Sequence, residues 1–194
     1  MIVFCKHIFA LIAFVFACSP VWATDCSQWK MFATTAKYLE PLSVPASKLQ
    51  NHLNASSWSD GVIVDVAMNE RELWMDIVYF PGETQAAAAV RIAFQVGRLT
   101  DEDFDKFVMA EDGRGVFSID EPALREIGCQ FIWGKEGGQN PIALMRHFFK
   151  ELKRYETGAP VFSGFTGSLL GDTTLALDVH NSFFVPEWVM SSVE

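Results

Sequence analysis

Two adjacent stretches of the chain alternate between apolar and polar side chains. Every second residue in 62–68 and in 73–79 is apolar, and Asp65, Trp74 and Asp76 are among the residues between them. A period of two is typical of β-strands, because successive side chains point to opposite faces. Only a short polar stretch separates the two runs, so the pattern predicts a β-hairpin with Trp74 on the face opposite its apolar neighbours.

The residues that precede this hairpin favour helices. Residues 27–39 carry apolar side chains at spacings of three and four, which predicts an amphipathic helix. A short second helix is expected after Pro45, where Ser47 and Gln50 have the spacing of a capping box. The polar residues 51–61 then predict a loop.

Two long helices are expected after the hairpin. Residues 83–96 are rich in strong helix formers and include four consecutive alanines, which would allow close packing on a sheet, and Gly97 is a natural terminator. Asn140 and Pro141 supply a cap and a preset first turn for a later helix.

The remaining residues predict strands and short connections. A short helix or a turn is expected at 100–103. A helix of about seven residues is expected between Asp120 and Gly128, with Pro122 in its first turn. Residues 134–139 predict a loop. Strands are predicted around 107–109, 116–118, 129–133 and 173–179. Hairpins interspersed with helices predict a single α+β domain with a largely antiparallel sheet.

The first 23 residues have the composition of a cleavable signal peptide. Lys6 precedes an unbroken apolar run over residues 8–17, Pro20 interrupts that run, and Ala23 suits the position before a signal peptidase cut. The sequence therefore predicts a signal at 1–23 and a mature domain at 24–194, which is periplasmic or secreted.

The N-terminal residues have two other interpretations. The apolar run has about half the length of a transmembrane helix, which argues against a retained anchor. Cys18 would be lipidated if the preceding residues formed a lipoprotein signal, but the bulky Phe16 near the cut argues against this. We expect no stable membrane insertion after the signal is removed.

The charge of the chain limits its partners. It holds 24 acidic and 15 basic residues, and of the basic residues the signal removes only Lys6. Nucleic acid is an improbable ligand for such a chain, because nucleic-acid binding draws on clustered Lys and Arg. An acidic surface instead favours a basic protein partner.

The mature chain keeps two of the four cysteines, Cys26 and Cys129. An even pair in an oxidising compartment predicts a disulfide between them. No second cysteine lies near either of them, as a CxxC redox site would require.

Asp178 and His180 are the candidate catalytic residues. If residues 173–179 form a strand, both side chains point to the same face, where a carboxylate can orient an imidazole and raise its pKa as a general base requires. The simpler interpretation is a solvated face that ends in a turn, since spacing identifies no nucleophile for the pair.

No metal or cofactor site is predicted. Asp101, Asp103 and Asp105 alternate as in a calcium loop, but Lys106 stands where that loop needs a glycine. The sequence also lacks the common nucleophile-elbow, zinc-helix and phosphate-loop motifs.

The tryptophans Trp58, Trp74 and Trp133 are candidate binding residues, because an exposed aromatic ring is a strong anchor for a partner. Packing in the core is the alternative role for each of them.

Three hypotheses of function follow. The favoured one is an exported, non-enzymatic protein that binds another macromolecule, such as an inhibitor, an immunity-type protein or an envelope accessory factor. The alternatives are a small exported hydrolase that uses Asp178 and His180, and a carrier of a small ligand in an aromatic-lined pocket.

Overall fold

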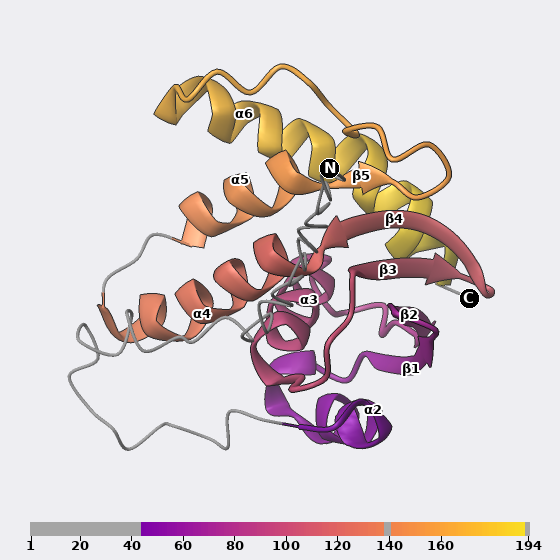
Figure 1. Cartoon of the computed structure of the whole chain (residues 1–194). Coiled ribbons are helices and arrows are strands. Elements are labelled where there is room, and N and C mark those ends of the chain that lie inside the picture. The colour runs from indigo at the N-terminus through magenta and orange to yellow at the C-terminus, as the bar shows by residue number, and fades with distance from the viewer. Residues whose placement is uncertain (1–43, 138–140, 193–194) are drawn as a thin grey trace, which may run out of the picture.

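The structure, a computed structural model, describes residues 44–137 and 141–192 (Figure 1). The chain forms α2 (Ala46–Ala55), the 3-10 turn η2 (Ser57–Ser59), β1 (Ile63–Asn69), β2 (Glu72–Tyr79), α3 (Ala87–Leu99), β3 (Lys106–Glu111), β4 (Arg114–Asp120), α4 (Glu121–Gly137), α5 (Pro141–Glu151), β5 (Lys153–Arg154) and α6 (Leu169–Val179). A π-helical segment, η3 (His180–Val189), continues α6 and ends in the 3-10 turn η4 (Met190–Ser192). The predicted signal peptide and the helix predicted at 27–39 lie outside the described residues.

The five strands form one mixed sheet in the order β1-β2-β3-β4-β5. β1 pairs antiparallel with β2, and β3 pairs antiparallel with β4, while β2 and β3 run parallel. A parallel pair needs a crossover connection, and α3 supplies it. The predicted α+β class and the hairpin at 62–79 are confirmed.

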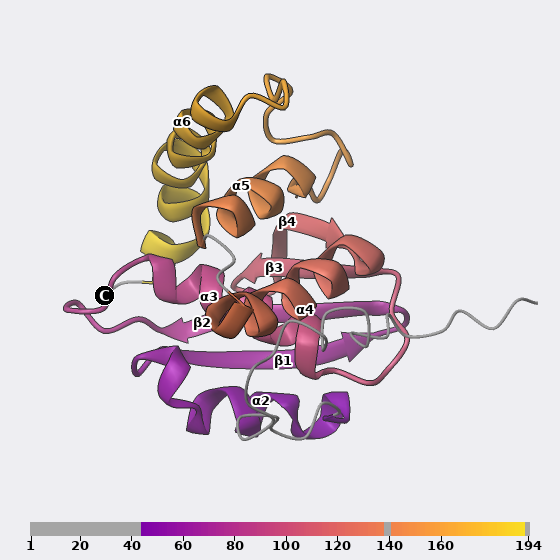
Figure 2. The same ribbon diagram turned by 90° about the vertical axis from the view of Figure 1, so that its left-hand side faces the viewer.

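One face of the sheet is the core. Leu73 pairs with Phe107, and Met75 pairs with Met109, and all four side chains are fully buried. Figures 1 and 2 place α3 and α4 on this side of the strands. The alternation of β1 and β2 therefore separates a helix-covered face from an outer face.

The helices α3 and α4 approach each other at two glycines. A Cβ atom at Gly97 would overlap the carbonyl oxygen of Leu124, and one at Gly128 would lie 2.6 Å from the backbone nitrogen of Arg98. Both glycines were predicted to end helices, and both lie inside them instead. The two residues allow close helix packing. Because Gly128 does not end α4, this helix continues through residues 129–133, where a strand was predicted, and into the predicted loop at 134–139.

The side chains of α2 bond to the free edge of the sheet. Asn54 Oδ1 accepts a hydrogen bond of 2.9 Å from the backbone N–H of Val64, and Gln50 Oε1 accepts one of 3.2 Å from Val66. Capping an edge strand in this way hinders pairing with another chain. Gln50 thus bonds to β1 instead of closing the predicted capping box, and α2 and η2 occupy much of the predicted loop at 51–61.

The C-terminal part of the chain is helical, contrary to the strand predicted at 173–179. Ser168 caps α6 by accepting a hydrogen bond of 3.3 Å from Gly171 N–H. Trp188, fully buried in η3, donates its indole N–H to the carbonyl oxygen of Ala110 over 2.9 Å. This bond connects the C-terminal helix to the end of β3.

Candidate functional site

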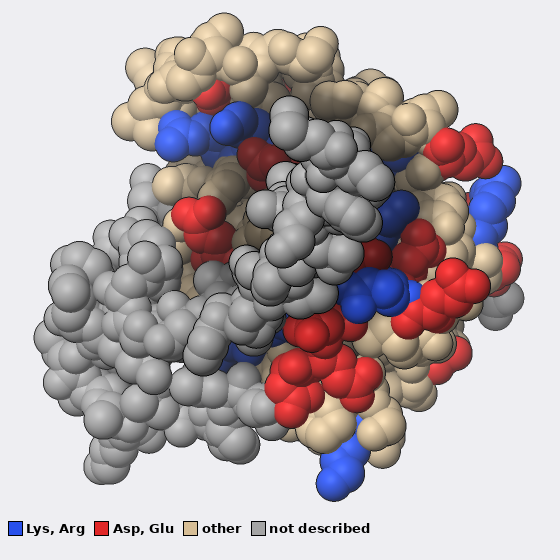
Figure 3. All heavy atoms as spheres, in the orientation of Figure 1, with Lys and Arg blue, Asp and Glu red and all other residues tan. Residues whose placement is uncertain are grey.

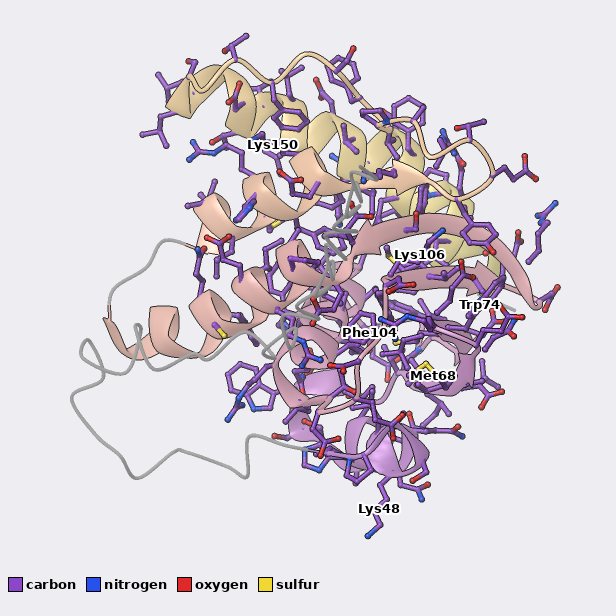
Figure 4. The ribbon with its side chains drawn as sticks, in the orientation of Figure 1. Lys48, Met68, Trp74, Phe104, Lys106 and Lys150 are labelled. Atoms are coloured by element: carbon purple, nitrogen blue, oxygen red, sulfur yellow. The ribbon has the colours of Figure 1, made fainter. Side chains whose placement is uncertain are left out.

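The outer face of the hairpin presents charged and aromatic side chains together. We define this outer face by seven side chains of β1, β2, the start of β3 and the residue after β5 that lie on the side away from the core: Asp65, Ala67, Glu72, Trp74, Asp76, Lys106 and Tyr155. Asp65 and Ala67 are exposed, and the other five are partly buried. Trp74 and Lys106 lie on the right of the molecule in Figure 4, over β2 and β3.

Two carboxylates oppose each other on this face. Asp65 of β1 is the register partner of Asp76 of β2, and Ala67 pairs with Trp74 beside them. Like charges directly across an antiparallel pair destabilise a sheet. Asp76 Oδ2 accepts a hydrogen bond of 2.7 Å from the backbone N–H of Gly113, whereas within the described part of the chain no cation pairs with Asp65.

Glu72 is the centre of a polar network next to Trp74. Its Oε2 atom accepts hydrogen bonds from Trp74 Nε1 at 3.1 Å and from the Tyr155 hydroxyl at 3.0 Å. The Lys106 ammonium lies 3.1 Å from Glu72 Oε1 and 5.6 Å from the centre of the Tyr155 ring. These contacts fix the orientation of the Trp74 indole.

The network shifts the pKa values of its members. Burial raises the pKa of Glu72, but the bonds from Lys106, Tyr155 and Trp74 outweigh burial, so the pKa lies below its usual value. Burial and the bond to Glu72 both raise the pKa of Tyr155. At neutral pH Glu72 is therefore charged and Tyr155 is a neutral donor.

Tyr155 reaches the sheet because β4 has a glycine beneath it. A Cβ atom at Gly115 would lie 2.6 Å from Cγ of the Tyr155 ring. The ring can therefore lie against β4 and meet Trp74 edge to face, with the ring centres 5.2 Å apart. Val108 and Ala110, on the same side of β3, are buried.

A cleft of about 400 Å³ adjoins the outer face through Gly115. Its charged side chains form ion pairs with one another: Arg114 pairs with Glu111 at 2.6 Å, and Arg154 makes a two-pronged contact with Glu187 of the π-helical segment. Glu156 also lines the cleft. The lining of the cleft therefore holds one more acidic than basic side chain.

The acidic side chains are unevenly distributed. In Figure 3 many Asp and Glu atoms lie at the lower centre and along the right-hand side, with Lys and Arg atoms among them, and the right-hand side is the side of the sheet in Figure 1. A separate group of Lys and Arg atoms lies at the upper left, beside α6. Negative charge next to an oriented indole suits a cationic ligand, which can contact both carboxylates and aromatic rings.

The structure separates the predicted pair of Asp178 and His180. The shared face depended on a strand, and Asp178 lies at the end of a helix, where residues two apart point in different directions. Asp178 is exposed, while the His180 ring stacks on Phe184 and its Nδ1 lies 2.8 Å from Asn181 Oδ1. The prediction of a shared face is wrong, and the hydrolase hypothesis loses its geometric basis.

The remaining predicted residues have different outcomes. Trp58 is partly buried and packs edge to face on Phe131 of α4, with ring centres 5.5 Å apart. Trp133 belongs to α4, but its side chain lies outside the described residues. Cys129 is buried in α4, and its pairing with Cys26 stays a prediction because Cys26 lies outside the described residues.

The described ranges, 44–137 and 141–192, contain no group of three or more His, Cys, Asp or Glu side chains arranged to hold a metal ion. None of their helices combines the length and the apolar composition needed to span a bilayer.

Sequence reasoning missed Tyr155 and Lys106 as members of the site. Trp74 was a candidate from the start, and its outward direction is confirmed.

Comparison of the chain with known protein families, with curated proteins and with solved structures finds no match to any of them. The case for a function therefore depends on the geometry of the outer face.

Proposed function

We propose that this chain is an exported, non-enzymatic protein that binds a basic protein partner through the outer face of its β1–β2 hairpin. The observation that carries the proposal is the placement of Asp65 directly opposite Asp76 and next to Trp74. This arrangement costs stability in the free protein. A cationic side chain of a partner, placed between the two carboxylates, would attract both of them and offset their mutual repulsion.

The aromatic residues support the same proposal. Trp74 is partly exposed, and its indole is fixed by the bond to Glu72 and by the Tyr155 ring. Tryptophan and tyrosine are enriched among the residues that dominate binding energy. A ring that is held in place before binding loses little side-chain entropy when the partner arrives.

The overall charge supports a basic partner as well. The chain carries a formal net charge of −9, and the proposed signal peptide contributes one of its few cations. Electrostatic complementarity of this kind accelerates association and makes it sensitive to salt. Export, which the N-terminal residues predict, would place the protein and its partner in the same extracytoplasmic space.

Site-specific photocrosslinking tests the proposal. A photoreactive amino acid replaces Ala67, which is exposed and opposite Trp74, and in a matched control it replaces Ala55, which is exposed at the end of α2. Both proteins are expressed in the cells that produce the natural chain, irradiated, and analysed by mass spectrometry.

The proposal predicts one dominant crosslinked protein at position 67, with an excess of Lys and Arg, whose yield falls as salt rises. Position 55 should not give this product. Identical products from both positions, or no product from position 67, would contradict a binding role for the outer face.

A further inference from the structure

A second cavity lies on the side of the molecule away from the outer face. It has a volume of about 340 Å³ and is lined by residues of α4, α5, α6 and the segment before α6: Gln130, Ala143, Arg146, His147, Lys150, Phe165, Gly167 and Asp172. This volume is at the lower end of the range for small-molecule sites. The cavity is therefore large enough for a small organic ligand.

The cavity concentrates basic side chains in an acidic protein. Arg146, His147 and Lys150 all belong to α5, and all three line the cavity. Arg146 donates a long hydrogen bond of 3.4 Å to the carbonyl oxygen of Leu169, and Lys150 lies 3.7 Å from Glu151. In the described part of the chain, no carboxylate lies within ion-pair distance of Arg146 or His147, although the charge of Arg146 helps to lower the pKa of Asp172.

The one carboxylate that lines the cavity is already bound by the protein. Asp172 is buried and accepts bonds from Thr166 N–H at 2.8 Å, from the Thr166 hydroxyl at 3.2 Å and from Gly167 N–H at 2.7 Å. These bonds hold the segment before α6 in place. They also leave the guanidinium of Arg146 and the ammonium of Lys150 with donors for another anion.

An apolar wall completes the cavity. Phe165 is partly buried, and its ring is steadied by an edge-to-face contact with Phe162, with ring centres 6.4 Å apart. Ala143 of α5 also lines the cavity. Small-molecule sites combine such an apolar surface with a few polar groups that orient the ligand.

We infer that this cavity binds a small organic anion, whose carboxylate contacts Arg146 and Lys150 and whose apolar part lies against Phe165. The guanidinium of an arginine suits a carboxylate because it can donate two parallel hydrogen bonds. A cavity of this size admits one ring but excludes a folded partner. The site is independent of the outer face and of the function proposed for it.

Calorimetric titration with benzoate tests this inference, with benzamide as the neutral analogue of the same shape. Three variants accompany the wild-type chain: Arg146→Gln, Lys150→Gln and Lys48→Gln. Lys48 and Lys150 are both exposed helical lysines, and Figure 4 shows them at opposite ends of the molecule. Lys48→Gln therefore removes the same charge without touching the cavity, and thermal melting verifies that each variant is folded.

The inference predicts saturable binding of benzoate with a Kd of about 1 mM or lower and at least tenfold weaker binding of benzamide. Arg146→Gln should weaken benzoate binding about tenfold, in line with the loss of a hydrogen bond between charged groups. Lys150→Gln should weaken it severalfold, and Lys48→Gln should leave it unchanged. The inference would be overturned if benzoate binding did not saturate or if benzamide bound equally well. Equal losses of benzoate affinity in Lys150→Gln and Lys48→Gln would also overturn it.

Discussion

Asp65 and Asp76 are directly opposed across the β1–β2 pair, on the face of the sheet that the helices of residues 44–137 and 141–192 leave uncovered. Asp76 accepts a hydrogen bond of 2.7 Å from Gly113 N–H. Asp65 is exposed and has no such bond within the described residues. A pair of this kind lowers the stability of the free hairpin. Residues that serve binding often carry such a cost in stability.

Asp65→Asn should therefore stabilise the free protein. Removing one of two opposed charges should raise the free energy of unfolding by about 0.2–1 kcal/mol at low ionic strength. Urea unfolding at 10 mM and 500 mM salt checks this, because the gain should shrink as salt screens the repulsion. The control is Asp178→Asn, an exposed aspartate on α6, which should change stability little. A loss of stability in Asp65→Asn would show that the opposed carboxylates do not repel.

Gly97→Ala should destabilise the protein strongly. Alanine normally improves a helix over glycine by up to about 1 kcal/mol, but at this position its Cβ would overlap the backbone of Leu124. We expect a net loss of about 1–3 kcal/mol, the usual cost of overpacking. Gly171→Ala in α6 is the matched control, because the nearest atom to its Cβ is Ser168 Oγ at 3.4 Å. Thermal unfolding should show a lower Tm for Gly97→Ala and an equal or higher Tm for Gly171→Ala. A higher Tm for Gly97→Ala would refute the close crossing of α3 and α4.

Tyr155 should make stability fall at alkaline pH. Its folded-state pKa is raised by burial and by the bond to Glu72, so its contribution is complete below the unfolded value of about 10 and is lost as pH rises through the folded value. Urea midpoints between pH 8 and 11 should therefore decline more steeply in the wild-type chain than in Tyr155→Phe. Parallel declines in the two proteins would mean that the hydroxyl does not bond to Glu72.

Asp172 should order the segment that precedes α6. Its pKa lies below the usual value because Thr166 N–H donates to it, with further bonds from Gly167 N–H and the Thr166 hydroxyl and a contribution from the charge of Arg146, against the opposing effect of burial. The resulting stability is present above the unfolded pKa of about 3.9 and is lost as pH falls through the folded value. In Asp172→Asn at neutral pH, hydrogen exchange at the Thr166 and Gly167 amides should be faster than in the wild-type chain. Unchanged exchange there, with the rest of the protein equally protected, would contradict this role.

The sequence predicted the hairpin well and the C-terminal helix poorly, and both outcomes have physical reasons. The hairpin places apolar residues strictly on one face, so its period of two is visible in the chain. In α6 the apolar side chains are not confined to one side: Asp172 is buried, while Leu170 is 81% exposed. No helical stripe forms, and the alternation over residues 173–179 resembled that of a strand.

Glycines and distant contacts account for the other differences. A glycine in the sequence marks either the end of a helix or a close approach, and only the packing partner tells which of these applies to Gly97 and Gly128. Trp74 was a candidate from its position on the hairpin alone. Tyr155, which bonds to Glu72 from 83 residues further along the chain, could be placed beside it only by the fold.

Crosslinking from position 67 decides whether the outer face binds a basic partner when its yield is compared in three proteins: wild type, Asp65→Asn and Asp178→Asn. At low salt Asp65→Asn should lower the yield roughly two- to fivefold, as expected for one exposed charge interaction, while Asp178→Asn should leave it unchanged. At high salt the three yields should converge at a lower value. Equal yields in all three proteins at low salt would contradict the claim.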